Sequence, residues 1–191
     1  MIEEFNITVF KYINHLAGIN PVLDGIVKIG AQYLPFIFIF WLLYLWLKHD
    51  DKYKNIVLYS IYSVSLGLLL NLLISLFYFH PRPFMIPVGK PLIQHKPDAS
   101  FPSDHTTFML SIAFILSYFK ETKIAGLILL VLGLMGGLAR IFCGLHFPMD
   151  IIGSLGVGLL SSFLIYLLQN KLGVLNRVII NLIQHHYNKA P

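Results

Sequence analysis

The chain has 191 residues, of which 57% are hydrophobic and only 12% are charged, and its mean hydropathy is +0.73. A soluble domain of this length is far less apolar, so the composition excludes one and predicts an integral membrane protein. The formal net charge of +5 suits a protein beside anionic lipid, but it is also common in membrane proteins without an anionic ligand. Cys143 is the only cysteine, so no intramolecular disulfide can form.

The N-terminal segment, residues 2–18, is predicted to lie on the membrane and not to cross it. Its apolar residues recur at helical spacing, and charged residues occupy the other face. The segment is too short and too polar to span, so we expect an interfacial helix. It lacks the positive start and small-residue cleavage site of a signal peptide.

Five hydrophobic blocks follow, each long enough or nearly so to cross ~30 Å of hydrocarbon at ~1.5 Å per residue. They cover residues 29–47, 55–79, 104–119, 123–142 and 150–169. The tail after residue 170 again has apolar residues at helical spacing, and we expect it to lie along the membrane. The expected fold class is therefore all-α, a polytopic membrane helix bundle of about five spans in which residues 1–191 form one domain.

The basic residues predict which loops face the cytoplasm. Five spans place the loops 80–103 and 143–149 on one side with the N-terminal segment, and the turns 48–54 and 120–123 on the other side with the tail. Eight of the 14 Lys and Arg residues fall on the second side and six on the first. Because cytoplasmic loops are enriched in Lys and Arg, we expect the loop 80–103 outside the cell membrane.

Three polar motifs fall on this outer side, HPRP at 80–83, PSDH at 102–105 and ARIFCGLHFPMD at 139–150. One charged residue at a membrane boundary is often only an interfacial anchor, but three motifs on one side favour a site. The candidate site residues are Arg82, Ser103, Asp104, His105, Arg140, His146 and Asp150.

The two arginines of this set predict an anionic ligand, because a guanidinium keeps its charge and presents a fork of donors to phosphate or carboxylate. Pro102 stands just before a predicted helix start, whose free N–H groups and positive dipole end also favour phosphate. Ser103 could add its hydroxyl to such a ligand. It could also be an ordinary helix cap. The two roles are compatible, because both use the same unpaired backbone donors.

The spacing of His146 and Asp150 indicates a nucleophile and its orienting group. Pro148 between them marks the first turn of the last span, where a carboxylate can bond to one imidazole nitrogen and leave the other free to attack. His105 remains as a second histidine that could protonate a leaving oxygen. Two histidines and two arginines are a sufficient set for phosphoryl transfer, so we expect neither a metal nor another cofactor.

Other uses of these residues stay open. The two histidines and two aspartates could hold a metal ion, although two arginines in the same cluster would repel a cation. Ser103 could be a triad nucleophile, although no strand-turn-helix elbow surrounds it. Cys143 lacks the spacing of a cysteine phosphatase loop. His80 and His95 are near enough to modulate the site, but surface histidines are the default interpretation.

The three motifs resemble the signature of the type 2 phosphatidic acid phosphatase superfamily, which joins Lys-x6-Arg-Pro, Pro-Ser-Gly-His and Ser-Arg-x5-His-x3-Asp. The corresponding residues here are Arg82-Pro83, Pro102-Ser103-Asp104-His105 and Ala139-Arg140 with His146 and Asp150. Within the superfamily, YFHPRPF, ASFPSDHTT and the overall length are similar to undecaprenyl-diphosphate phosphatases of the bacitracin-resistance type.

This resemblance implies hydrolysis of undecaprenyl diphosphate to the monophosphate and inorganic phosphate, which recycles the lipid carrier of peptidoglycan synthesis and gives bacitracin resistance. It implies that His146 attacks the terminal phosphorus to form a phosphohistidine, that Asp150 orients it, and that His105 protonates the leaving oxygen. The partners would be the lipid substrate and membrane lipids, with no nucleic acid. The phosphate-binding residues would be Arg82, Ser103, Arg140 and Asp104.

Three positions depart from the signature. Ser75 stands where the family has its lysine, Ala139 replaces the serine before the arginine, and Asp104 replaces glycine. Asp104 could pair with an arginine or with His105, and we hypothesise that it tunes His105 or Arg82. Asn71 is expected to bond between helices.

Two alternative functions remain. The chain could be another lipid phosphatase of the superfamily, acting on phosphatidylglycerophosphate or phosphatidate. It could also be a non-enzymatic binder or transporter that uses the arginines only to hold a lipid diphosphate.

Overall fold

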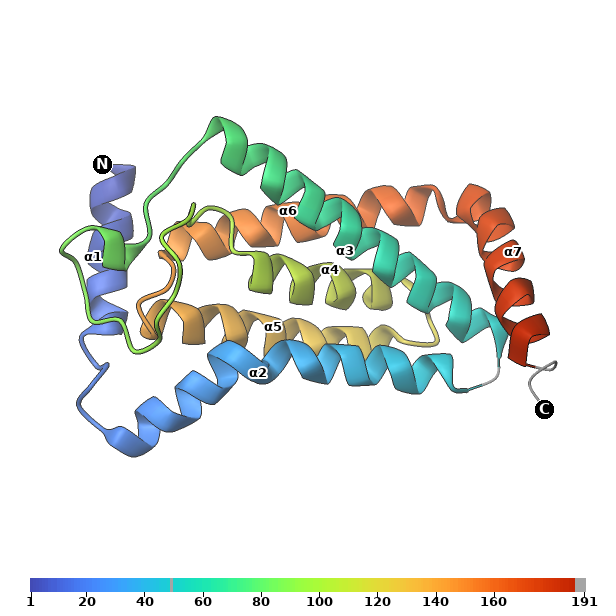
Figure 1. Cartoon of the computed structure of the whole chain (residues 1–191), viewed down its shortest axis with the longest axis horizontal. Coiled ribbons are helices and arrows are strands. Elements are labelled where there is room, and N and C mark those ends of the chain that lie inside the picture. Colours follow the sequence, from blue (N-terminus) through green and yellow to red (C-terminus); the bar gives the residue numbers. More distant parts are fainter. Residues whose placement is uncertain (49, 188–191) are drawn as a thin grey trace.

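The computed structural model describes residues 1–48 and 50–187, and within these ranges every regular element is helical. Helices α2 to α6 run along the long axis of the molecule, while α1 crosses one end and α7 crosses the other (Figure 1). This arrangement confirms the predicted all-helical membrane bundle. The elements are α1 (Ile2–Asn14), α2 (Pro21–Trp46), α3 (Asp51–Phe77), the 3-10 turn η1 (Pro83–Met85), α4 (Asp104–Tyr118), α5 (Lys123–Phe142), α6 (Pro148–Leu167) and α7 (Gln169–Tyr187).

Four of these helices, α2, α3, α5 and α6, are long and apolar enough to cross a membrane. The remaining expected span, 104–119, corresponds to α4, whose 15 residues measure only ~22 Å along the helix axis. Nine of them are buried, because α4 packs against α3, α5 and α6. Its apolar composition therefore reflects a central position in the bundle.

Helix starts follow local capping chemistry. Asn20 accepts hydrogen bonds from the first free amides of α2, with Pro21 at the first helical position. Asp50 caps α3 and Ser103 caps α4 in the same way. Pro148 begins α6. The starts of α2, α4 and α6 lie at the end of the bundle that α1 crosses, whereas α3 starts at the end beside α7 (Figure 1).

The first span begins earlier than the expected 29–47. The expected boundary is too late because a charged residue, the buried carboxylate Asp24, lies in the first turn of the helix. Asp24 accepts a hydrogen bond from the amide of Gly18 at 3.1 Å to each oxygen, and the residue is only 8% exposed. A hydropathy pattern excludes such a charged residue from an apolar block. Its bond to the preceding turn nevertheless lets the helix extend back to Pro21.

Helix α1 is tied to the loops at its end of the bundle. The Asn14 side chain donates to the carbonyls of Phe142 (2.7 Å) and Lys90 (3.0 Å) and accepts from the Lys90 amide (2.6 Å). Asn6 accepts from the amide of Met149 at 3.0 Å. Both asparagines are buried, so the predicted interfacial helix also fixes the chain on either side of the α5–α6 turn.

Candidate active site

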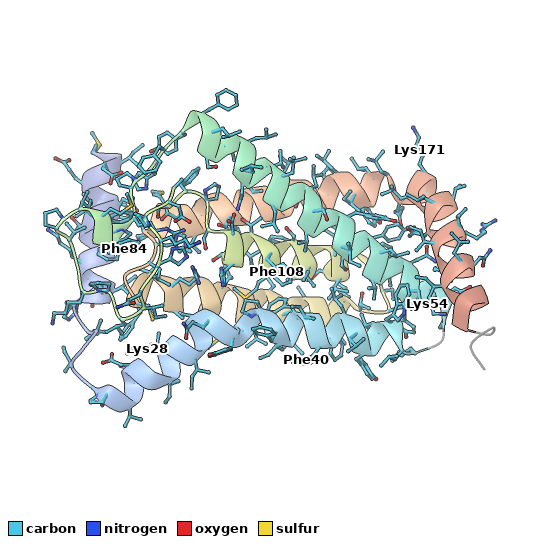
Figure 2. The ribbon with its side chains drawn as sticks, in the orientation of Figure 1. Lys28, Phe40, Lys54, Phe84, Phe108 and Lys171 are labelled. Atoms are coloured by element: carbon cyan, nitrogen blue, oxygen red, sulfur yellow. The ribbon has the colours of Figure 1, made fainter. Side chains whose placement is uncertain are left out.

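The polar motifs of the sequence meet at the end of the bundle beside α1. The long loop 78–103 passes over the start of α4, the end of α5 and the start of α6 (Figure 1). Nitrogen-bearing side chains concentrate in this region (Figure 2). Parts of the chain that are remote in sequence thus contribute to one site.

His146 lies at the centre of this region, in the turn between α5 and α6, and is 1% exposed. Its Nδ1 is 2.9 Å from the Ser100 carbonyl oxygen and 3.3 Å from Asp150 Oδ2. Two acceptors at Nδ1 place the ring proton there and leave the lone pair on Nε2. Arg82 Nη1 donates to that Nε2 at 3.0 Å, so the free nitrogen faces a guanidinium.

The environment of His146 keeps its imidazole neutral. The pKa of His146 is lowered to about 4, mainly by burial; the charges of Arg140 and Arg82 act in the same direction, and the bond to Asp150 opposes them. At neutral pH the ring therefore has an unprotonated nitrogen. An imidazole must be neutral to attack phosphorus, and the guanidinium of Arg82 beside it can bind the anionic group that is attacked.

Asp150 holds His146 and the start of α6 together. The residue is fully buried, and its Oδ2 accepts the amide of Phe147 at 2.8 Å and the hydroxyl of Ser100. The same oxygen faces His146 Nδ1, and the other oxygen lies 3.5 Å from His80 Nδ1. The spacing of four residues therefore places the carboxylate against the imidazole, as the sequence pattern predicts.

Arg82 is fixed from several sides. Its Nε donates to Asp98 Oδ1 at 2.5 Å, and its Nη1 and Nη2 donate to the carbonyls of Leu145 (3.1 Å) and Ala99 (3.4 Å). The side chain is 7% exposed, whereas that of Asp98 is 55% exposed. Because Asp98 reaches in from the surface, the guanidinium is held in position by a partner that water can solvate.

Arg140, in the last turn of α5, is the second buried cation. It is 3% exposed, and its Nη1 donates to the carbonyl of Ala31 in α2 at 3.1 Å. Its Nε has no hydrogen-bond partner in the described part of the chain. A buried guanidinium with an unmatched donor is costly unless an anion approaches it.

The PSDH motif forms the first turn of α4. Ser103 Oγ accepts from the amide of Thr106 at 3.5 Å and its hydroxyl at 3.1 Å, so the residue acts as the helix cap. Asp104 Oδ1 accepts from Asn71 of α3 at 2.8 Å. No ion pair of Asp104 with Arg82 and no hydrogen bond to His105 is present among the described residues, because the first turn of α4 directs the carboxylate towards α3. The charge of Asp104 acts on Arg140 instead, and tuning of His105 or Arg82 stays a prediction.

His105 is half-buried on the first turn of α4. It lies within electrostatic range of Arg140, Arg82 and His95, so it shares the field of the site. Among residues 1–48 and 50–187, no side chain hydrogen-bonds to its ring. Burial and the charges of Arg140, His95 and Arg82 lower the pKa of His105 to about 4, so the ring is unprotonated at neutral pH. A bound anion would offset these charges and favour the protonated form that can donate.

The alternative chemistries find less support. Within the described residues, no three His, Cys, Asp or Glu side chains are grouped to hold a metal ion. Burial raises the pKa of the Cys143 thiol to about 11, which disfavours a nucleophilic thiolate. Ser103 makes its side-chain contacts with Thr106, and not with a histidine as a triad requires.

Sequence reasoning missed two contributors on the loop 78–103 and gave a third, His80, at most a modulating role. Ser100 contacts both His146 and Asp150, Asp98 holds Arg82, and His80 is buried beside Asp150 where a surface histidine was the default. None of them has a fixed spacing to its partner. The sequence signal of Asp98 and Ser100 is only the polar residues between Arg82 and Ser103, whereas His80 belongs to the HPRP motif. Asn71 bonds between α3 and α4, as expected.

Known proteins share both the sequence and the fold. The family model described as the PAP2 superfamily matches residues 56–173. The chain is 41% identical to "Undecaprenyl-diphosphatase BcrC" of Bacillus subtilis (strain 168), over 84% of this chain and 82% of that protein. It is 30% identical to "Bacitracin transport permease protein BcrC" of Bacillus licheniformis, over 93% of this chain and 87% of that protein.

A solved structure agrees with these matches. The crystal structure of Aquifex aeolicus LpxE superposes with a TM-score of 0.70 and 26% identity, covering 85% of this chain and 94% of that chain. The family model spans more than half of the chain and includes every candidate site residue. The chain therefore belongs to the PAP2 superfamily and is an integral membrane phosphatase.

Proposed function

We propose that this phosphatase hydrolyses undecaprenyl diphosphate to undecaprenyl phosphate and inorganic phosphate through a phosphohistidine. The observation that carries the mechanism is the orientation of His146, whose Nδ1 faces Ser100 and Asp150 while Nε2 faces Arg82. The substrate assignment is supported by the relative named undecaprenyl-diphosphatase. The chain acts as a single membrane phosphatase domain.

In the first half-reaction, His146 Nε2 attacks the terminal phosphorus, and the bond from that phosphorus to the bridging oxygen breaks. His105 gives its proton to that oxygen, which leaves as undecaprenyl phosphate. Asp150 stabilises the positive charge that develops on the His146 ring. Arg82 and Arg140 bind the transferring phosphoryl group, where their charges are worth most in the transition state.

In the second half-reaction, water attacks the phosphohistidine. His105, now unprotonated, takes a proton from that water, and the bond between phosphorus and His146 Nε2 breaks to release inorganic phosphate. Ser103 and the free amides of α4 hold the phosphate at the helix N-terminus. Asp104 acts on this phosphate site through the turn that it anchors to Asn71.

We place the site on the extracytoplasmic face of the cell membrane, because the positive-inside count puts the loop 80–103 there. A lipid carrier released on that side would present its diphosphate to this end of the bundle. Removal of the diphosphate would also give bacitracin resistance, and the relative from Bacillus licheniformis is named for bacitracin transport.

The test is phosphate release by purified protein from undecaprenyl diphosphate, phosphatidylglycerophosphate and phosphatidate, with and without a chelator. We expect preference for the prenyl diphosphate and no effect of the chelator. Preference for a glycerolipid would overturn the substrate, and loss of activity with the chelator would overturn the metal-free mechanism.

His146→Ala separates a phosphatase from a binder or transporter. The substitution removes the proposed nucleophile and is expected to lower phosphate release by roughly 10³-fold or more. Elution as a single species in detergent, as for the unmodified protein, is the control for folding. Retained hydrolysis would remove His146 from the mechanism.

A further inference from the structure

Two buried polar atoms beside the proposed nucleophile face each other. His80 Nδ1 and Asp150 Oδ1 lie 3.5 Å apart, and neither makes a conventional hydrogen bond to any described residue. One is a nitrogen that can donate and the other is a carboxylate oxygen that can only accept. A shift of roughly 0.5 Å would bring them to an ordinary hydrogen-bond distance.

The other ring nitrogen of His80 also faces a carboxylate. His80 Nε2 lies 3.5 Å from Glu3 Oε1 in the first turn of α1. The ring is flanked by Tyr78, whose ring is parallel to it with centroids 6.0 Å apart, and by Phe147, edge-on at 5.2 Å. These aromatic rings pack against the imidazole in an orientation in which each ring nitrogen faces one carboxylate.

This geometry favours the doubly protonated ring. The carboxylate of Asp150 is the main cause that raises the pKa of His80, burial opposes it, and Glu3 raises it further. Asp150 of α6 and Glu3 of α1 are the charged groups that act on His80 from the packed elements. An imidazolium is the form in which both nitrogens donate.

We propose that His80 is a positioning residue that, as an imidazolium, donates to Asp150 Oδ1 and keeps Asp150 Oδ2 on His146. Glu3 of the N-terminal helix stabilises the charged form. This inference rests on the proposed phosphohistidine mechanism and adds a second histidine to the carboxylate that orients the nucleophile.

Charge compensation is the reason that Asp150 needs this partner. A fully buried carboxylate is unfavourable unless it is paired, and His146 stays neutral in the resting site. Arg82 is directed to Asp98 and His146, and Arg140 to Ala31. Within the described chain, His80 is therefore the cationic group that faces Asp150 without weakening the nucleophile.

Glu3→Gln tests this inference without touching the buried site, because the Glu3 side chain is 55% exposed. Removal of its charge should lower the pKa of His80, so the protonated ring is lost at lower pH. We expect the alkaline limb of the kcat profile to shift down by about half a pH unit. Glu4→Gln is the matched control, since Glu4 faces the chain N-terminus instead.

The pKa of His80 itself can be followed by NMR of histidine-labelled protein in detergent, without any substrate. It should fall in Glu3→Gln and stay in place in Glu4→Gln. Coincident titrations of both variants and the unmodified protein would overturn the proposal. This result is independent of the lipid that the enzyme cleaves, so it can fail while the proposed function stands.

Two substitutions of His80 separate positioning from simple packing. His80→Phe keeps a ring but removes both donors, and we expect kcat to fall roughly 10- to 100-fold with KM within about twofold. His80→Gln keeps a neutral donor, so it should recover part of kcat and lose the alkaline limb. The rates are measured with whichever lipid phosphate the unmodified protein cleaves best. Equal losses in both variants, or no loss in either, would overturn the role.

Discussion

The two ends of the bundle differ in how their positive charges are partnered. At the end beside α7, Lys52 pairs with Glu121 at 3.3 Å, with side chains 52% and 30% exposed, and Lys48 lies over the ring of Tyr53 at 4.6 Å. At the end beside α1, Arg82 and Arg140 are 6% and 3% exposed. Lys54 at the end beside α7 is also buried, but it pairs with Asp51 at 3.4 Å. Arg140 at the other end has no carboxylate partner among the described residues.

This difference shows which charges the fold could do without. An exposed ion pair adds little to stability, and a membrane protein can keep it only as an interfacial anchor. Two buried guanidinium groups are expensive, and among the described carboxylates only Asp98 hydrogen-bonds to either of them. They are best explained by an anion that completes the site, which the opposite end does not require.

Among substitutions of the positive charges at the two ends, Arg82→Lys should reduce activity the most. The change keeps a positive charge but removes the fork that donates to His146 and Leu145 at once. We expect kcat/KM for lipid diphosphate to fall by about 10²-fold or more, measured as phosphate release. A loss of less than about threefold would mean that charge alone suffices at this position.

The stability of the protein at mildly acid pH tests the buried state of His146. The pKa of His146 is lowered to about 4, so between its usual value and pH 4 the unfolded chain takes up a proton that the folded chain does not. The free energy of unfolding should therefore fall as the pH drops through this window, by at most on the order of 3 kcal/mol. Thermal unfolding of His146→Gln, in which this pH dependence disappears, is the comparison.

The sign is reversed for His80, whose pKa is raised. Its contribution to stability is complete below the ordinary histidine pKa and is lost as the pH rises through the raised value. His80→Gln should therefore flatten the alkaline side of the stability curve and leave the acid side unchanged. A change on the acid side would contradict the assignment of the two histidines.

Asp104→Asn should have a smaller effect. The amide can still accept from Asn71, so the contact between α3 and α4 weakens without breaking. We expect a reduction of a few-fold in kcat/KM, corresponding to part of one hydrogen bond of ~1 kcal/mol. An unchanged pH–rate profile together with unchanged affinity for diphosphate would exclude any role of Asp104 in the site.

Lys52→Ala should have the smallest effect of all. It removes an exposed ion pair at the end beside α7, and we expect phosphate release to stay within about twofold of the unmodified protein. A loss comparable to that of Arg82→Lys would show that the two ends are not functionally distinct.

The parts of the site that sequence could predict are those fixed by local geometry. His146 and Asp150 are four residues apart across a helix start, so their contact at 3.3 Å needs only one turn of backbone. The cap at Ser103 and the helix start at Asp104 follow from the same short-range rules. The all-helical membrane fold follows from the length and apolarity of the blocks.

The remaining parts depend on how distant segments meet. The path of an irregular loop brings three residues to the site, Asp98, Ser100 and His80. Asn71 hydrogen-bonds to Asp104 from a different helix. The sequence also could not show that α4 is too short to span the membrane. An apolar block looks the same in sequence whether it faces lipid or other helices.

The central claim, that His146 becomes phosphorylated during turnover, is tested most directly by acid–base stability of a trapped label. Protein would be quenched in alkali within the first turnover of lipid labelled in its terminal phosphate. We expect a label that is stable to base, lost in acid, mapped to the peptide containing His146 and absent from His146→Ala. An unlabelled chain during active hydrolysis, or an acid-stable label on another residue, would contradict it.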